Sequence, residues 1–203
     1  MNETADPAEF PCLVLTHGID EILQRSVASI IECDARLSVD VLHNPSPAED
    51  GTFVGFALAE LRAGRIRSFT RFDENISNNS VLLYLLANRD RYSNGTVLIS
   101  DGDILVPEGS IEEEAHILAN HSDVFACGLR IDASRWSDSL PVKRNSIERF
   151  NTAKFEAADY VNSATGMWMT MFRGAELMAI VDVMQRNGVR FTDGAWQRTG
   201  AFA

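Results

Sequence analysis

Residues 96–103 read Thr-Val-Leu-Ile-Ser-Asp-Gly-Asp, an apolar run followed by two aspartates that flank one glycine. The run is short and continuously apolar, which is typical of a strand buried on both faces of a parallel sheet. Residues two positions apart in an extended segment point the same way, so Asp101 and Asp103 are expected to face one point. Gly102 keeps the backbone small where a ligand could come close. The stretch therefore predicts a buried strand with a polar site at its end.

Strand and helix patterns alternate along the whole chain. Short apolar runs predict strands at residues 12–16, 37–42, 67–72, 96–100, 124–131 and 167–172. Amphipathic or capped segments predict helices at 19–31, 53–61, 81–87, 110–121 and 177–188, and a helix is also compatible with 146–158. This alternation predicts a single-domain α/β fold, with a mostly parallel sheet and helices on both faces. In such sheets the chemistry collects at the carboxyl ends of the strands.

Polar residues mark the expected starts of three helices. Asp20 is placed to serve the N-terminus of the first helix. Ser80 is expected to cap the third helix, and Ser110 with Glu113 three residues later matches a capping box.

Composition and charge exclude several classes of partner. The chain has 203 residues, with 18 Lys and Arg against 29 Asp and Glu, and a net charge of −11. No basic run could form the stripe that a nucleic-acid groove needs, so nucleic acid and anionic membranes are poor partners. No apolar run approaches about 18 residues, so no transmembrane segment is expected. The first residues lack a signal-peptide pattern, which favours a cytoplasmic protein.

Domain organisation is simple in the sequence. Residues 1–11 are expected to form a disordered leader, and residues 12–203 a single folded domain. The three cysteines are widely spaced in apolar stretches, so we expect buried free thiols rather than a disulfide framework. The oligomeric state stays open, a homo-oligomer included.

The two aspartates of the 96–103 stretch are candidate metal ligands. Two carboxylates that lie close repel each other unless a cation sits between them. Hard oxygen ligands favour Mg²⁺ or Mn²⁺, and such ions usually also hold substrate phosphates. A plain Asp-Gly turn is the alternative interpretation. His116 and His121 form no recognisable ligand spacing with Asp101, so a zinc site is not expected.

Four further segments of the sequence, taken together with the two aspartates, follow a recognisable order. The first strand enters a helix through Leu15-Thr-His-Gly-Ile-Asp-Glu-Ile22, and the second strand ends in Leu42-His-Asn-Pro-Ser46. A short turn containing Gly95 leads into the strand that ends in the Asp-x-Asp (DxD) motif. Past the motif comes Gly166-Met-Trp-Met-Thr-Met-Phe-Arg173. In this order and spacing, residues 12–196 resemble a family-two glycosyltransferase with the GT-A fold.

The resemblance implies a nucleotide-sugar-binding domain that moves a sugar from a nucleotide-diphosphate-sugar donor to an acceptor. Thr16 and His17 would then line the nucleotide pocket. Asn44, or His43, would lie where the family holds the base or the ribose. The family usually has Asp at this point, so His43-Asn44 is a departure that bears on nucleoside recognition.

The resemblance also assigns roles to three aspartates. Asp101 would contact the ribose or a metal-bound water, and Asp103 would ligate the metal and hence the donor diphosphate. Both belong to the implied Mn²⁺ or Mg²⁺ site. Asp193, in Phe191-Thr-Asp-Gly-Ala-Trp-Gln197, is the nearest candidate for the base that takes a proton from the acceptor. Trp168 is expected to pack in the core.

Two other function classes stay open. A phosphatase of the haloacid-dehalogenase type also uses Asp-x-Asp after a strand, but that class has its motif on the first strand. A non-catalytic GT-A-like binding module is the other, since the second strand lacks the family's Asp. The common signatures of serine hydrolases, P-loop NTPases and dinucleotide-binding enzymes are absent from the sequence.

Overall fold

The computed structural model describes residues 9–129, 155–156, 161–162, 166–192 and 195–198. Its helices are α1 (Asp20–Cys33), α2 (Thr52–Arg62), α3 (Asn79–Ala87), α4 (Arg89–Tyr92), α5 (Ser110–Asn120) and α7 (Gly174–Arg186). Its strands are β1 (Phe10–Thr16), β2 (Leu37–His43), β3 (Ser68–Arg71), β4 (Thr96–Asp101), β5 (Ala126–Gly128), β6 (Phe155–Glu156), β7 (Val161–Asn162), β8 (Thr170–Arg173), β9 (Val189–Thr192) and β10 (Ala195–Arg198).

Six strands form the main sheet in the order β3-β2-β1-β4-β8-β5. The four strands from β3 to β4 are mutually parallel, whereas β8 is antiparallel to both β4 and β5. The expected α/β fold with a mostly parallel sheet is therefore confirmed. The additional pairs β6–β7 and β9–β10 are two-stranded and antiparallel.

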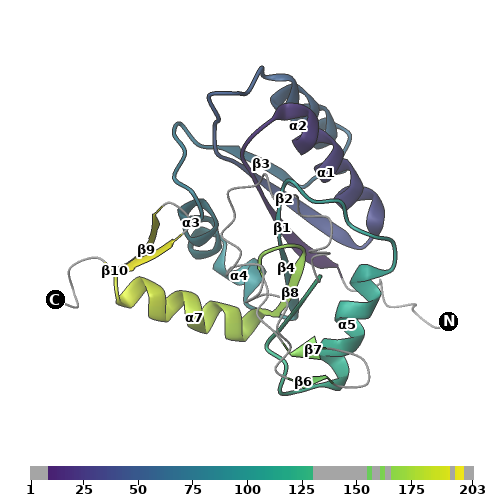
Figure 1. Cartoon of the computed structure of the whole chain (residues 1–203), viewed down its shortest axis with the longest axis vertical. Coiled ribbons are helices and arrows are strands. Elements are labelled where there is room, and N and C mark those ends of the chain that lie inside the picture. The colour runs from purple at the N-terminus through teal and green to yellow at the C-terminus, as the bar shows by residue number, and fades with distance from the viewer. Residues whose placement is uncertain (1–8, 130–154, 157–160, 163–165, 193–194, 199–203) are drawn as a thin grey trace.

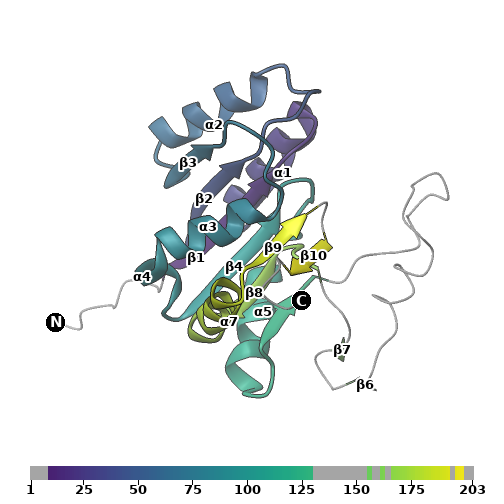
Figure 2. The same cartoon turned by 90° about the vertical axis from the view of Figure 1, so that its left-hand side faces the viewer.

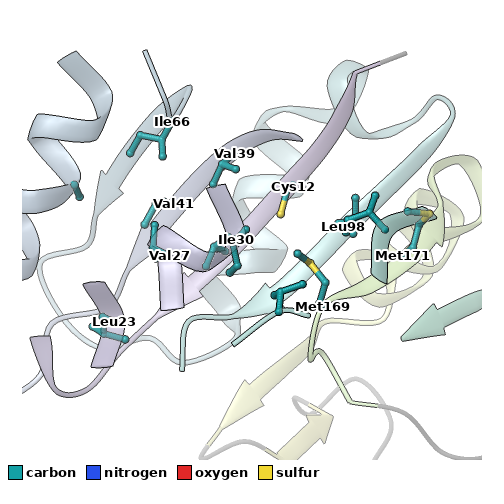
Figure 3. Packing of buried hydrophobic residues seen from close by; sticks show 14 of the residues in the cluster. Cys12, Leu23, Val27, Ile30, Val39, Val41, Ile66, Leu98, Met169 and Met171 are labelled. Carbon is teal, nitrogen blue, oxygen red and sulfur yellow. The ribbon is translucent and has the colours of Figure 1, made fainter. Parts of the chain in front are cut away.

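Helices cover both faces of the sheet, as the sequence predicts (Figures 1 and 2). One face packs against α1, α2 and α5, and the other against α3, α4 and α7. Alternate residues of β1 supply the two cores: Cys12 and Val14 face the first group of helices, and Leu13 and Leu15 the second. Figure 3 shows the first core, in which Ile30 of α1 and its neighbours pack on the central strands.

The first strand begins two residues earlier than expected. Phe10 pairs with Leu37 of β2 and its backbone N–H donates to the carbonyl of Arg36 at 2.9 Å. Pro11, the last residue of the expected leader, is buried within the strand. The pairing partner β2 extends the strand past the apolar run on which the sequence-based boundary rested.

Two expected helix caps are wrong. Ser80 lies inside α3 and its Oγ donates to the carbonyl of Ser77 at 2.8 Å. Ser110 is the first residue of α5, and its Oγ donates to the carbonyl of Pro107 at 2.7 Å. Each hydroxyl therefore gives its proton back to the preceding turn instead of accepting a bond from the helix. The predicted capping box with Glu113 is absent, because Glu113 N–H bonds the carbonyl of Gly109.

Three other boundaries differ from the expectation. Of the strand expected at 124–131, the described residues form only the short β5, and residues 130–131 lie outside the described part of the chain. The strand expected at 167–172 starts only at Thr170. Met169 has φ of 49°, outside the extended range, so the strand cannot include the residues before Thr170. Most of the helix considered at 146–158 lies outside the described residues, and residues 155–156 within it form β6. In the described part of the chain, no helix has both the length and the apolar character needed to cross a bilayer.

Candidate active site

The carboxyl ends of β1, β2 and β4 lie side by side because these strands are parallel neighbours. Thr16 pairs with His43 across β1 and β2, and Leu15 pairs with Asp101 across β1 and β4. The chain leaves β1 toward β2 and later returns on the other side of β1 as β4. In open α/β sheets, ligands bind outside the carboxyl ends of the strands where the order reverses in this way. The residues that follow these strands therefore form the candidate site.

Asp101 and Asp103 lie at this switch point. Asp101 is the last residue of β4 and is partly buried, and Asp103 is exposed. The backbone N–H of Asp101 donates to the carbonyl of Met167 at 2.7 Å, which fixes the strand end against the segment before β8. Burial and the neighbouring Asp103 carboxylate raise the pKa of Asp101 to about 7. A bound cation would relieve both penalties, because it stabilises the ionised forms.

Gly102 is required by the close approach of β1 and the turn after β4. A Cβ at this position would lie 2.5 Å from Cγ2 of Thr16 and 2.8 Å from the carbonyl oxygen of Leu15. Both distances are shorter than non-bonded contacts allow. Glycine therefore lets the turn that carries the two aspartates pack directly on the end of β1.

Thr16 is buried and its hydroxyl is engaged within the protein. Its Oγ1 lies 3.0 Å from the carbonyl oxygen of Leu42 and 3.0 Å from Nδ1 of His43. Nε2 of the buried His43 lies 2.8 Å from Oε2 of Glu49, whose other carboxylate oxygen accepts a bond from Arg71 at 2.6 Å. His43 and Arg71 together lower the pKa of Glu49 to about 2. A continuous polar chain thus runs from β3 to the end of β1.

Asn44 is also buried and its side chain is bonded inside the protein. Its Nδ2 donates to the carbonyl of Ser77 at 3.1 Å and to Oγ of Ser80 at 3.3 Å. Its Oδ1 accepts a bond from the backbone N–H of Ile76 at 3.3 Å. These bonds hold the segment before α3, where Ser77 has φ of 55°. The side chain of Asn44 therefore positions this segment.

His17 is the exposed member of the group. Its Nδ1 lies 3.2 Å from the backbone carbonyl oxygen of Asn44, so Nδ1 carries the donated proton. Its Nε2 lies 3.4 Å from Nδ2 of Asn75. The ring is thereby held in one orientation at the solvent side of the strand ends.

The donor set fits a hard divalent cation that also contacts a ligand. Among the residues that the structure describes, no group of three His, Cys, Asp or Glu side chains could hold a metal ion. The site can offer the carboxylates of Asp101 and Asp103. Mg²⁺ is commonly held by one or two carboxylates together with substrate phosphates, so two protein ligands are sufficient for that kind of site.

Comparisons with known proteins bear on the fold of this chain. No family model matches the chain. Two curated relatives from Acanthamoeba polyphaga mimivirus are similar in sequence: uncharacterized protein L137 is 27% identical over 91% of this chain, and uncharacterized protein L142 is 21% identical over 95%. The chain spans 26% of the length of the first and 40% of the second.

Among solved structures, the glycosyltransferase TarS of S. aureus has a similar fold. Its crystal structure in complex with UDP aligns with a TM-score of 0.56 and 14% identity, over 95% of this chain and 52% of that one. Another crystal structure of TarS 1-349 aligns with a TM-score of 0.55 and 14% identity, over 91% of this chain and 50% of that one. This chain has a GT-A-like fold.

Two further residues singled out in the sequence are Asp193 and Trp168. Asp193 lies outside the described residues. Trp168, for which the sequence pattern favours packing in the core, is half-buried, and its indole ring lies against Gly166. Trp168 also follows Met167, the residue whose carbonyl bonds Asp101.

Sequence reasoning missed the roles of Glu49, Arg71 and Asn75. Glu49 and Arg71 end the polar chain that begins at Thr16, and Asn75 lies against His17. Their partners come from different segments of the chain, and only the parallel pairing of β1, β2 and β3 brings those segments together.

Proposed function

We propose that this protein is a metal-dependent glycosyltransferase that moves a sugar from a nucleotide-diphosphate-sugar donor to an acceptor hydroxyl group. The supporting observation is the Asp101-Gly102-Asp103 turn packed on the end of β1 at the switch point of a GT-A-like sheet. On this proposal residues 12–203, together with the first two residues of β1, form the nucleotide-sugar-binding domain.

The residues at the strand ends divide into ligand-binding and positioning groups. Asp101 and Asp103 would hold Mn²⁺ or Mg²⁺, which when bound supplies a Lewis acid to the leaving diphosphate. His17 is exposed and oriented, and would contact the nucleoside. The side chains of Thr16 and Asn44 are bonded to neighbouring segments of the protein. These two residues would therefore form the floor of the donor site and position the residues that contact the donor.

The reaction needs one proton transfer that the protein must perform. The bond between the sugar and the diphosphate breaks as a bond to the acceptor oxygen forms, and the diphosphate leaves with the electron pair. The acceptor hydroxyl loses its proton to a base, a role that we assign to the carboxylate of Asp193. Asp193→Asn should abolish sugar transfer while nucleotide binding persists. Loss of both together would instead give Asp193 a role in donor binding.

Calorimetric titration with nucleotides tests the metal site. UDP and GDP are titrated with and without Mn²⁺ into the native protein and into Asp101→Asn/Asp103→Asn. At least one nucleotide should bind with Mn²⁺, and the double variant should lose that binding. The matched control is Asp90→Asn/Asp123→Asn, which removes the same charge from two exposed positions and should bind normally. Equal binding by both double variants would contradict the metal assignment.

The same protein samples separate the alternative functions. Release of free nucleoside diphosphate from a nucleotide-sugar in the presence of an acceptor would support the glycosyltransferase function. Metal-dependent nucleotide binding without turnover of any sugar donor would favour the non-catalytic module. Covalent trapping of beryllofluoride at Asp101 would point to the phosphatase class.

A further inference from the structure

We infer that His43 is a positioning residue, which through Thr16 holds the Asp101-Gly102-Asp103 turn in the geometry that lets both carboxylates face one ligand. The inference rests on the proposed function for what the ligand is, but the positioning itself stands on contacts within the protein.

His43 contacts Glu49 on one side and Thr16 on the other. The contact with Glu49, the outer half of this arrangement, fixes the imidazole ring. Nε2 of His43 lies 2.8 Å from Oε2 of Glu49, and Glu49 is held in turn by Arg71 and by the backbone N–H of Ser46. Because the pKa of Glu49 is about 2, this carboxylate is ionised near neutral pH and accepts the bond. Nε2 therefore carries a proton, and the ring has one orientation.

The inner half transmits that orientation to Thr16. Nδ1 of His43 lies 3.0 Å from Oγ1 of Thr16, which is also 3.0 Å from the carbonyl oxygen of Leu42. Neither His43 nor Thr16 is exposed to solvent, so water cannot replace either bond without entering the core. Because Nε2 carries the ring proton, Nδ1 of His43 and the carbonyl oxygen of Leu42 share the single hydroxyl proton of Thr16 in a three-centre bond. This bond holds the side chain of Thr16 in one rotamer, which also fixes the direction of its methyl group.

That methyl group forms the surface on which the metal-binding turn rests. A Cβ at Gly102 would lie 2.5 Å from Cγ2 of Thr16, so the glycine and the methyl group are in direct contact. Rotation of Thr16 about its Cα–Cβ bond would exchange the methyl and hydroxyl positions and change the surface beneath Gly102. Asp101 and Asp103 flank that glycine, so their separation depends on the rotamer of Thr16.

Two isosteric substitutions separate the two halves of the arrangement. In His43→Asn the side-chain amide lies where Nδ1 was, so the contact with Thr16 is kept and the contact with Glu49 is lost. In His43→Gln the amide lies where Nε2 was, so Glu49 keeps its partner and Thr16 loses it. Thermal unfolding establishes that both variants fold and how much stability each one loses.

Backbone NMR provides a readout that needs no metal or nucleotide. In ¹⁵N-labelled protein, the amide signals of Gly102 and Asp103 should shift strongly in His43→Gln and much less in His43→Asn. Equal shifts in the two variants, or unshifted signals in His43→Gln, would overturn the inference. The expected order is opposite to the one that loss of the contact between His43 and Glu49 alone would produce.

Titration of Mn²⁺ with UDP adds a second readout. His43→Gln should lose about tenfold more affinity than His43→Asn, since residues that orient metal ligands typically contribute about 10–100-fold. Similar losses in both variants would overturn the inference. If the native protein binds neither Mn²⁺ nor UDP, the proposed function fails, and the NMR comparison still decides the positioning role.

Discussion

At the scale of single residues, Gly102 is the position where the smallest change should have the largest effect. Gly102→Ala places a methyl group 2.5 Å from Cγ2 of Thr16 and 2.8 Å from the carbonyl oxygen of Leu15, which belongs to the central strand. Overpacking of this kind typically costs about 1–3 kcal/mol. We expect the free energy of unfolding in urea to fall by that amount, and metal-dependent nucleotide binding to be lost.

Gly55→Ala is the matched control for this substitution. Gly55 is exposed within α2, and a Cβ there would meet no atom within 4 Å. Alanine is favoured over glycine inside a helix by about 1 kcal/mol, so this variant should be more stable than the native protein. If the free energy of unfolding changes in the same direction in both variants, the steric account of Gly102 is wrong.

Glu114 is a second residue with a measurable consequence. Its side chain is buried in α5, and neither carboxylate oxygen has a hydrogen-bond partner. Burial, with a smaller effect of Glu113, raises its pKa from 4.5 to about 9. At pH values between these two pKa values, Glu114 is ionised in the unfolded chain and protonated in the folded protein. Stability should therefore fall as pH rises from about 4.5 toward 9, by at most about 1.4 kcal/mol per pH unit.

Urea unfolding at pH 5 and pH 8 measures this slope. Glu114→Gln removes the titrating group and should lose less stability between the two pH values than the native protein does. Glu113→Gln, an exposed neighbour in the same helix, should keep most of the native slope. An unchanged slope in Glu114→Gln would mean that Glu114 is ionised in the folded protein.

At the scale of elements, Asp20 joins two helices. It is the first residue of α1, yet its Oδ2 accepts the backbone N–H of Phe53 in the first turn of α2 at 2.9 Å. Asp20→Ala should reduce the free energy of unfolding by about 0.5–2 kcal/mol, as loss of a helix cap does. Asp20→Asn keeps an acceptor oxygen and should cost less. Glu21→Ala, exposed in the same turn, should have little effect, and an equal loss there would contradict the cap.

The elements differ in how far the sequence determines them. Continuous apolar runs such as residues 96–100 predict buried strands well, because burial on both faces excludes polar residues. The antiparallel place of β8 beside β4 could not be predicted, since periodicity carries no information on strand order. The serine caps failed because a hydroxyl in the first helical turn can donate backward as readily as it can accept.

The same distinction applies to the candidate site. Asp101, Gly102 and Asp103 are contiguous, so their shared place at the end of a strand is visible in the sequence. The bonding of His43 depends on Thr16, which is 27 residues away in the chain. The side chain of Asn44 bonds Ser80, at a separation of 36 residues. Such pairs follow from strand register and loop path, so a single sequence indicates which residues follow the strands but not which side chains they bond.

At the scale of the whole molecule, the net charge of −11 opposes the binding of a nucleoside diphosphate. An anionic ligand is repelled by the average field of the protein, and a divalent cation held by Asp101 and Asp103 would reverse the local sign. The repulsion is long-ranged, so salt screens it. The Debye length falls from about 30 Å at 0.01 M to about 10 Å at 0.1 M ionic strength.

This gives opposite salt dependences for the two ligands when each is titrated alone. Affinity for UDP without a divalent ion should rise between 0.01 and 0.1 M NaCl, because screening weakens repulsion. Affinity for Mn²⁺ alone should fall over the same range, because screening weakens attraction to the acidic protein. Calorimetry at both salt concentrations measures the two signs, with NaCl replaced by sucrose of equal osmolality as the control for non-ionic effects. A fall in UDP affinity with salt would mean that a local cationic group outweighs the acidic field, and the metal would then be dispensable for holding the diphosphate.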